Sequence, residues 1–235
     1  YICTMKVLFL LCLLTQVPVT DSLDLLVERV HDSMISIDTH NDFSMQLAFP
    51  EQRATVTKGQ VSFELMKTGR LDAAFFAAYQ GQGPCTGEDH GRAKYLADSM
   101  LMALHRYARE HRQLGAVAYS AADVRTLKKQ GKASLLLSIE NAYCLGRDIS
   151  LVEHYYRMGV RMICLTHNGN NCVADAAMDS LETHGGLSPF GYQVIQEMNR
   201  LGMIVDVSHA SRKTCLQAVQ ASKTPVMASH SGVYN

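Results

Sequence analysis

Apolar and polar positions follow two alternating patterns along the chain, and together they predict strands and helices in turn. Short, almost wholly apolar runs are typical of parallel strands that are buried on both faces of a sheet. We expect strands at residues 34–38, 73–79, 134–139, 161–165, 203–207 and 226–229.

Between these runs, apolar residues recur every three or four positions, as on the buried face of a helix. Ser120 with Asp123 three residues later matches a capping box, and Ser188 followed by Pro189 matches a helix start. We expect helices at 23–30, at 89–114, from Ser120 to Gly131, from Asp148 to Gly159, from Ser188 to Gly202, and at 212–221.

Strands that alternate with helices predict an α/β fold with a parallel sheet covered on both sides. Two architectures fit this order. One is an open, doubly wound sheet of six strands. The other is a (β/α)8 TIM barrel of which about the first six strand–helix units are present.

The first twenty residues have a different character. Met5-Lys6 precedes an apolar run at 7–14, which is too short for a bilayer core that needs about 20 apolar residues. It resembles the apolar region of a signal peptide. We therefore expect a signal peptide at 1–20, one domain at 21–235, and export to the periplasm, the cell surface or the medium. A buried N-terminal strand or helix is the alternative.

Composition narrows the functional classes. The chain has 22 Lys and Arg against 22 Asp and Glu, so it lacks the net positive charge that would attract nucleic acid. We therefore expect no nucleic-acid partner. Hydrophobic residues make up 47% of the chain, which excludes a disordered one. Its seven cysteines show no CxxC spacing, which argues against a cysteine-only zinc site.

Histidines and carboxylates follow five of the six expected strands. Since the carboxyl ends of parallel strands meet at one edge of the sheet, these side chains should lie together. They are His40 and Asp42 after the first strand, Glu140 after the third, His167 after the fourth, His209 after the fifth and His230 after the sixth.

Imidazole and carboxylate ligands of this kind suit Zn²⁺, with Mn²⁺, Co²⁺ or Fe²⁺ open. His40 and Asp42 stand at alternate positions and can face one ion, while the two oxygens of Glu140 can bridge two ions. Two ions about 3.5–4 Å apart are typical of hydrolases. Asp38 and Asp206 lie inside strands and are candidates to orient histidines, although Asp206 could equally be structural. The remaining histidines, His90 among them, we expect at the surface or behind the site.

At these residues the sequence resembles a known family. The segments 37–42, 138–141, 165–168, 185–191, 205–209 and 228–231 are similar to successive motifs of membrane (renal-type) dipeptidases, binuclear zinc enzymes of the amidohydrolase superfamily. The likeness runs from about residue 34 to residue 235 and implies the TIM barrel. The Ala/Gly-rich loop before Cys85 looks more like the bacterial branch than the mammalian one.

The resemblance implies two zinc ions per chain and hydrolysis of dipeptides by a hydroxide that bridges them. His40 and Asp42 would hold one ion, His209 and His230 the other, and Glu140 both. His167 would contact the scissile carbonyl or its oxyanion. Comparable loop positions suggest a disulfide between Cys85 and Cys172, both expected to be accessible. The resemblance also allows a homodimer.

Two features of the family are missing from this sequence: an aspartate acid/base and an arginine that binds the substrate carboxylate. We therefore expect a fragment of a longer protein, or a prematurely ended gene, that binds metal weakly and turns over poorly. Two alternatives stay open. Another amidohydrolase, such as a deaminase, would usually begin with H-x-H, and a catalytically inactive paralogue would bind metal without turnover.

Overall fold

A computed structural model describes residues 22–49 and 61–232, in two compact units that comprise residues 1–34 and 35–235. In the first unit, helix α1 (Ser22–Ser33) has no buried residue. The expected signal peptide lies outside the described residues. Among the described helices, none has the length and apolar character needed to cross a membrane.

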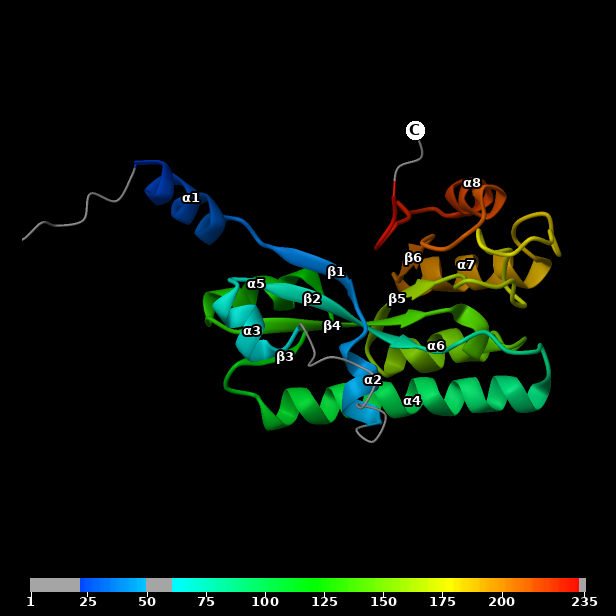
Figure 1. Cartoon of the computed structure of the whole chain (residues 1–235), viewed down its shortest axis with the longest axis horizontal. Helices are drawn as coiled ribbons and strands as arrows, with labels where there is room; N and C mark the ends of the chain where they lie inside the picture. Colours follow the sequence, from blue (N-terminus) through cyan, green and yellow to red (C-terminus); the bar gives the residue numbers. More distant parts are fainter. Residues whose placement is uncertain (1–21, 50–60, 233–235) are drawn as a thin grey trace, which may run out of the picture. The chain divides into compact units, whose positions relative to one another are not determined.

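The second unit is built on a parallel sheet of six strands (Figure 1). The strand order is β1-β2-β4-β5-β6, with β3 alongside β4. The strands are β1 (Ile37–Asn41), β2 (Ala73–Tyr79), β3 (Gly115–Val117), β4 (Ala133–Glu140), β5 (Val160–Cys164) and β6 (Ile204–Asp206). The pairings between these strands are all parallel, as the strand–helix alternation predicts.

Strand β4 is the centre of this sheet, and every one of its residues is buried. It pairs along its length with β2, from Ser134 opposite Ala73 to Glu140 opposite Tyr79. Its other edge is shared, because β3 pairs with its first residues and β5 with its last. This arrangement fixes Glu140 at the carboxyl edge between β2 and β5.

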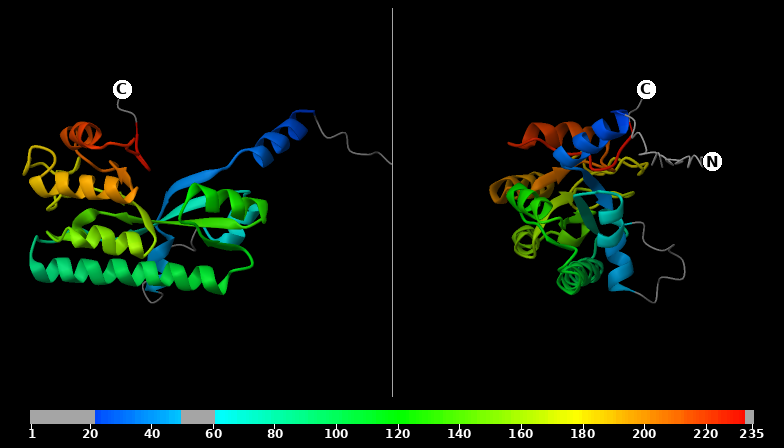
Figure 2. Two further views of the ribbon diagram at one scale, coloured as in Figure 1. Left: turned by 180° about the vertical axis from the view of Figure 1, so that it is seen from behind. Right: turned by 90° about the vertical axis from the view of Figure 1, so that its left-hand side faces the viewer.

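Helices cover the sheet and connect its strands. Figure 2 shows the long helix α4 beside the strands, and α6, α7 and α8 pack one against the next. The helices of this unit are α2 (Phe43–Ala48), α3 (Phe63–Thr68), α4 (Gly87–Glu110), α5 (Ala121–Lys129), α6 (Ser150–Arg157), α7 (Pro189–Leu201) and α8 (Arg212–Ala221), with a 3-10 helix η2 (Ala142–Leu145).

Both faces of the sheet are covered by apolar side chains. Phe76 and Leu135 belong to the larger core together with Leu104 of α4, whereas Phe75 and Leu136 belong to a second cluster with Val124 of α5. Since neighbouring residues of one strand point to opposite faces, the near-continuous apolar runs follow from burial on both sides.

Several predicted elements are confirmed. Strand β2 and helix α8 have the expected bounds. Ser120 caps α5 by accepting a hydrogen bond from the Asp123 amide, and Ser188 caps α7 with Pro189 in its first turn. Gly202 ends α7 in the left-handed conformation, with φ 75°.

Other predictions need correction. The first strand begins at Ile37 rather than residue 34, and the run at 226–229 forms only an isolated bridge between Met227 and Asp206. The sixth strand of the sheet is instead β3, whose three residues are too few to give a pattern. The helix expected to reach residue 114 ends at Glu110, because a turn there leads into β3. Asp148 precedes the N-cap Ile149 of α6, although its carboxylate still accepts from the Ser150 amide.

Candidate metal centre

The predicted site residues come together at the carboxyl edge of the sheet. His40 lies within β1 and Glu140 is the last residue of β4, so both are inside strands rather than just beyond them as the sequence pattern suggested. Asp42 is the N-cap of α2. His167, His209 and His230 follow β5, β6 and the Met227 bridge.

Glu140 is the centre of the cluster. Its side chain is 5% exposed, and the Nε2 atoms of four histidines surround its two oxygens. The Nε2–Oε distances are 3.5 Å for His40, 3.8 Å for His167, 3.1 Å for His209 and 3.6 Å for His230. A carboxylate so placed faces imidazole nitrogens from four separate segments of the chain.

The histidines also lie close to one another. The Nε2 atoms of His209 and His230 are 2.8 Å apart, and the ring centres of His40 and His230 are 3.9 Å apart. The cluster contains two triplets of residues, and within each triplet the donor atoms all lie within 4.8 Å of one another. One triplet is His40, Glu140 and His230, and the other is Glu140, His167 and His209. Glu140 is common to both, as expected of a bridging ligand. This grouping places His209 and His230 in different triplets, whereas the family resemblance assigns them to one ion.

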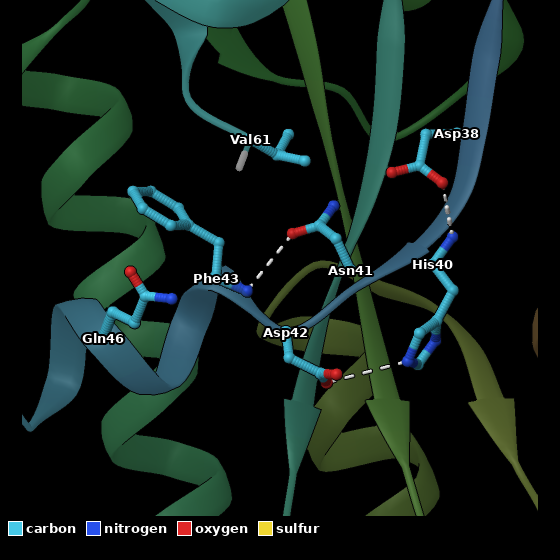
Figure 3. A pocket seen from close by; sticks show the side chains of 7 residues that line it. All are labelled: Asp38, His40, Asn41, Asp42, Phe43, Gln46 and Val61. Atoms are coloured by element: carbon cyan, nitrogen blue, oxygen red, sulfur yellow. Dashed lines mark hydrogen bonds and ion pairs between the residues drawn. The ribbon is translucent and has the colours of Figure 1, made fainter. Parts of the chain in front are cut away.

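Asp42 is the most exposed residue of the cluster, and its carboxylate faces the ring of His40 (Figure 3). Its Oδ1 is 3.6 Å from Nε2 of His40, and its side chain is 58% exposed. The two residues line a hollow of about 330 Å³ that also contains Phe43, Gln46 and Val61. The hollow therefore gives a small molecule access to the His40 side of the cluster.

The protonation of these groups suits metal binding. Burial lowers the pKa of His167, and burial together with the charge on His40 lowers the pKa of His230. Neutral imidazole is the form that binds a metal. Burial also acts to lower the pKa of His40, but the carboxylates of Asp42 and Glu140 outweigh it and raise that pKa to about 10. The two carboxylates that stabilise the proton on His40 would also stabilise a metal cation at that place. The nitrogen and oxygen donors of the cluster fit a borderline divalent metal.

A buried carboxylate fixes His230 through a serine. Asp206 is 1% exposed and accepts hydrogen bonds from the amides of Ser208 and Ser229 and from Ser229 Oγ at 2.6 Å. Ser229 Oγ in turn lies 2.9 Å from Nδ1 of His230. The prediction that Asp206 orients a histidine is thus refined, because it acts through Ser229. Asp38 accepts from the backbone amide of His40 and not from its ring (Figure 3).

Two residues at the cluster have an unusual backbone. His209 has φ 61° and Asn141, which follows Glu140, has φ 76°. Such left-handed conformations in residues other than glycine concentrate at functional sites. Asn141 Oδ1 accepts from the side chain of Asn171 at 2.9 Å, which ties the end of β4 to the loop after β5. No pattern in the sequence indicates these conformations.

Tyr79 and Asp175 are further residues that sequence reasoning missed. Tyr79 ends β2 and its ring centre lies 4.8 Å from that of His167. Asp175 is 1% exposed and accepts from the amides of Thr183, His184 and Gly186, so it organises the loop between β5 and α7. Only the position of Tyr79 at a strand end could have indicated its place.

The cysteines differ from expectation in one respect. Cys85 is exposed, but Cys172 is buried at 3% exposure, so the two are not an equally accessible pair. Both are free thiols in this structure, and their pairing stays a prediction. His90, expected at the surface or behind the site, has its Nε2 3.8 Å from the Cys172 sulfur.

A parallel α/β sheet that carries histidines and carboxylates at its carboxyl edge defines a class of metal-dependent hydrolases. Comparison with known proteins gives the family. Residues 26–235 match the membrane dipeptidase family, peptidase family M19, and the chain belongs to it.

Curated relatives come from fungi and animals. The dipeptidase tcpJ of Claviceps purpurea is 32% identical over 87% of this chain and 48% of its own length. The dipeptidase aclJ of Aspergillus oryzae is 34% identical over 88% and 52%, and mouse dipeptidase 3 is 31% identical over 83% and 40%. The chain thus spans about half the length of these relatives.

Solved structures share the fold. The probable dipeptidase PvdM from Pseudomonas aeruginosa matches with a TM-score of 0.79 and 30% identity over 88% of this chain and 55% of its own. A metallo peptidase from Rhodobacter sphaeroides matches with a TM-score of 0.73 at 23% identity, which is a likeness of fold. Since fungal, mouse and bacterial proteins all match, the expected bacterial branch stays a prediction.

Proposed function

We propose that this protein is a metal-dependent dipeptidase that hydrolyses the peptide bond of dipeptides. The observation that carries the proposal is the buried carboxylate of Glu140 with four histidine nitrogens around it, in a chain of the M19 family. The curated relatives are named dipeptidases, which supports the same reaction here.

The residues that would hold the metal are His40, Asp42, Glu140, His209 and His230, with Glu140 shared between two ions. Zinc fits this donor set best, because imidazole and carboxylate are both its common ligands. A bound pair would polarise the substrate carbonyl and make hydroxide available at neutral pH.

The chain's own residues then position the substrate and the ligands. His167, whose pKa is lowered by burial, would be neutral and able to donate a hydrogen bond to the oxygen that gains charge during hydrolysis. Asp206 and Ser229 hold Nδ1 of His230, so that its Nε2 faces Glu140. The hollow beside Asp42 would admit the dipeptide.

We further infer that the sheet is part of a (β/α)8 barrel. Its all-parallel order and the match to PvdM, at a TM-score of 0.79 over 55% of that chain, support this architecture. The site would then lie at the carboxyl end of the barrel, where enzymes of this fold carry their active sites.

The test is metal content and hydrolysis of a dipeptide panel, on this chain and on the chain extended to its genomic stop codon. We expect about two zinc ions per chain and chelator-sensitive cleavage in the extended protein. Metal without cleavage of any dipeptide would instead favour another amidohydrolase or a non-catalytic paralogue. The absence of metal in both would refute the site.

We also propose that the protein is exported, because Met5-Lys6 and the apolar run at 7–14 resemble a signal peptide. Expression from the natural start should yield mature protein outside the cytoplasm, with a new N-terminus near residue 20. Protein that keeps residues 7–14 and stays in the cytoplasm would contradict export.

A further inference from the structure

A second cluster of metal-ligand side chains shares no residue with the Glu140 site. It consists of Cys85, His90 and Cys172, whose donor atoms lie within 4.8 Å of one another. Cys85 belongs to the loop after β2, His90 to the beginning of α4, and Cys172 to the loop after β5. Three separate segments therefore present two sulfurs and a nitrogen to one point.

The spacing of the donors suits a tetrahedral ion. The sulfur of Cys172 lies 3.8 Å from Nε2 of His90. Sulfur and nitrogen ligands of zinc, at about 2.3 and 2.0 Å from the metal, lie roughly 3.6 Å apart. Only a small movement would be needed to close this triplet around a metal.

The surrounding chain is shaped to hold His90. A Cβ added at Gly146, which has φ +53°, would lie 2.8 Å from Nδ1 of His90, so only glycine leaves room for the ring. The ring of Tyr143 contacts the His90 ring edge-on, with ring centres 5.0 Å apart. The Tyr143 hydroxyl also donates to the Pro84 carbonyl at 2.6 Å, directly before Cys85. Tyr143 thus positions two members of the cluster.

Cys172 is held as well. Its carbonyl accepts a hydrogen bond from Ser188 Oγ at 2.6 Å, and the preceding Asn171 donates to Leu165 and Asn141. Cys172 is 3% exposed whereas Cys85 is exposed. An ion could therefore enter from the Cys85 side, and solvent there could supply a fourth ligand.

A metal explains the cluster better than a disulfide does. A bond between Cys85 and Cys172 would use both sulfurs and leave no role for the imidazole beside them. Two thiols and an imidazole are a donor set that zinc prefers, and three protein ligands plus water complete its tetrahedron. The sequence pattern does not indicate this site, because its three residues lie in separate segments and the cysteines lack CxxC spacing.

We propose that Cys85, His90 and Cys172 form a further metal site for a thiolate-preferring divalent ion of the zinc class. The ion would join the loops after β2 and β5. Asn171 of the loop after β5 forms a hydrogen bond with Asn141, which is next to Glu140. The bound ion would therefore also stabilise the surroundings of the Glu140 cluster.

The test uses Co²⁺ as a probe on the reduced full chain, because cobalt bound to thiolate gives a near-ultraviolet charge-transfer absorption that cobalt on imidazole and carboxylate does not. We expect this absorption in the parent and in Glu140→Gln. It should be lost in Cys85→Ser, with one metal equivalent fewer than the parent, and weakened in His90→Gln. Cys215→Ser is the matched control, since that thiol is in neither cluster, and it should keep the absorption.

A second measurement is independent of cobalt and of variants. Zn²⁺ should protect Cys85 and Cys172 from alkylation in the parent, and each protected thiol can be mapped by mass spectrometry. No absorption in the reduced parent, or unchanged absorption in Cys85→Ser, would overturn the proposal. It would also fail if a Cys85–Cys172 disulfide formed in air despite saturating Zn²⁺.

Discussion

The carboxylate of Glu140 lies 3.1 Å from Nε2 of His209, although the two residues belong to different segments at the edge of the sheet. Glu140 is fixed as the last residue of the fully buried β4, whereas His209 follows β6 in a left-handed conformation. The contact depends on the parallel arrangement of β4, β5 and β6, since only that arrangement brings their carboxyl ends to one place.

Replacing Glu140 with glutamine should remove the ligand shared by both donor triplets. We expect loss of at least one metal equivalent and a fall in dipeptide hydrolysis of at least about 10²-fold. Metal analysis and steady-state kinetics of the extended protein would check both. Glu182→Gln is the control, because that exposed carboxylate pairs only with Lys213 among the described ion pairs. Full metal content in Glu140→Gln would contradict a bridging role.

Ser229→Ala should weaken metal binding without removing a ligand. Its hydroxyl connects Asp206 to Nδ1 of His230, and residues that orient a ligating histidine typically contribute 10–100-fold to affinity. Competition with a chelator would measure the loss. The exposed Ser150→Ala should leave affinity unchanged, since Ser150 bonds only Asp148 among the described contacts. Equal affinities for both variants would show that the Ser229 contact has no positioning role.

Metal binding should release a proton from His40 near pH 7.5. Its pKa is raised to about 10 in the metal-free chain, so the ring is protonated there and must lose that proton to bind metal. Calorimetry in buffers of different ionisation enthalpy would show a buffer-dependent heat. His40→Asn should reduce this dependence, and a heat independent of buffer in the parent would contradict the prediction.

The same raised pKa has a consequence for the stability of the metal-free chain. Because the folded pKa of His40 exceeds its unfolded value of about 6.5, its contribution is fully present below that value. It is lost as the pH rises through about 10. The urea midpoint of the metal-free parent should fall over this range more than that of His40→Asn, and parallel curves would refute this.

Ser188→Ala should destabilise the fold more than Ser120→Ala does. Both serines cap a helix, and loss of such a cap costs about 1 kcal/mol. Ser188 is buried and its hydroxyl also donates to the carbonyl of Cys172, whereas Ser120 is exposed. Urea unfolding of the two variants gives the comparison. An equal loss would mean that the bond to Cys172 contributes nothing.

The sequence indicated most of the fold because local signals and burial agreed. Strand β2 is apolar throughout, and its predicted bounds agree with the structure, as do those of α8. Strand β3 was missed because three residues carry no periodicity. The run at 226–229 looked like a strand, yet it contributes only the Met227 bridge.

The positions of the candidate ligands, whose metal binding stays a prediction, were also predictable, since polar residues directly at the ends of apolar strands are conspicuous. The contacts around them were not. That Asp206 reaches His230 through Ser229 depends on the packing of two segments, and no spacing in the sequence records it. His90 belongs to a helical pattern in the sequence, and that pattern does not predict that two cysteines lie near its ring.

Anomalous diffraction from zinc-loaded crystals of the protein would test most directly whether Glu140 bridges two metal ions. We expect two peaks beside Glu140, each about 2.0–2.2 Å from one of its carboxylate oxygens, with the histidine nitrogens completing the coordination. A single peak bound by only one oxygen of Glu140, or none near it, would contradict the bridging carboxylate and the dipeptidase mechanism built on it.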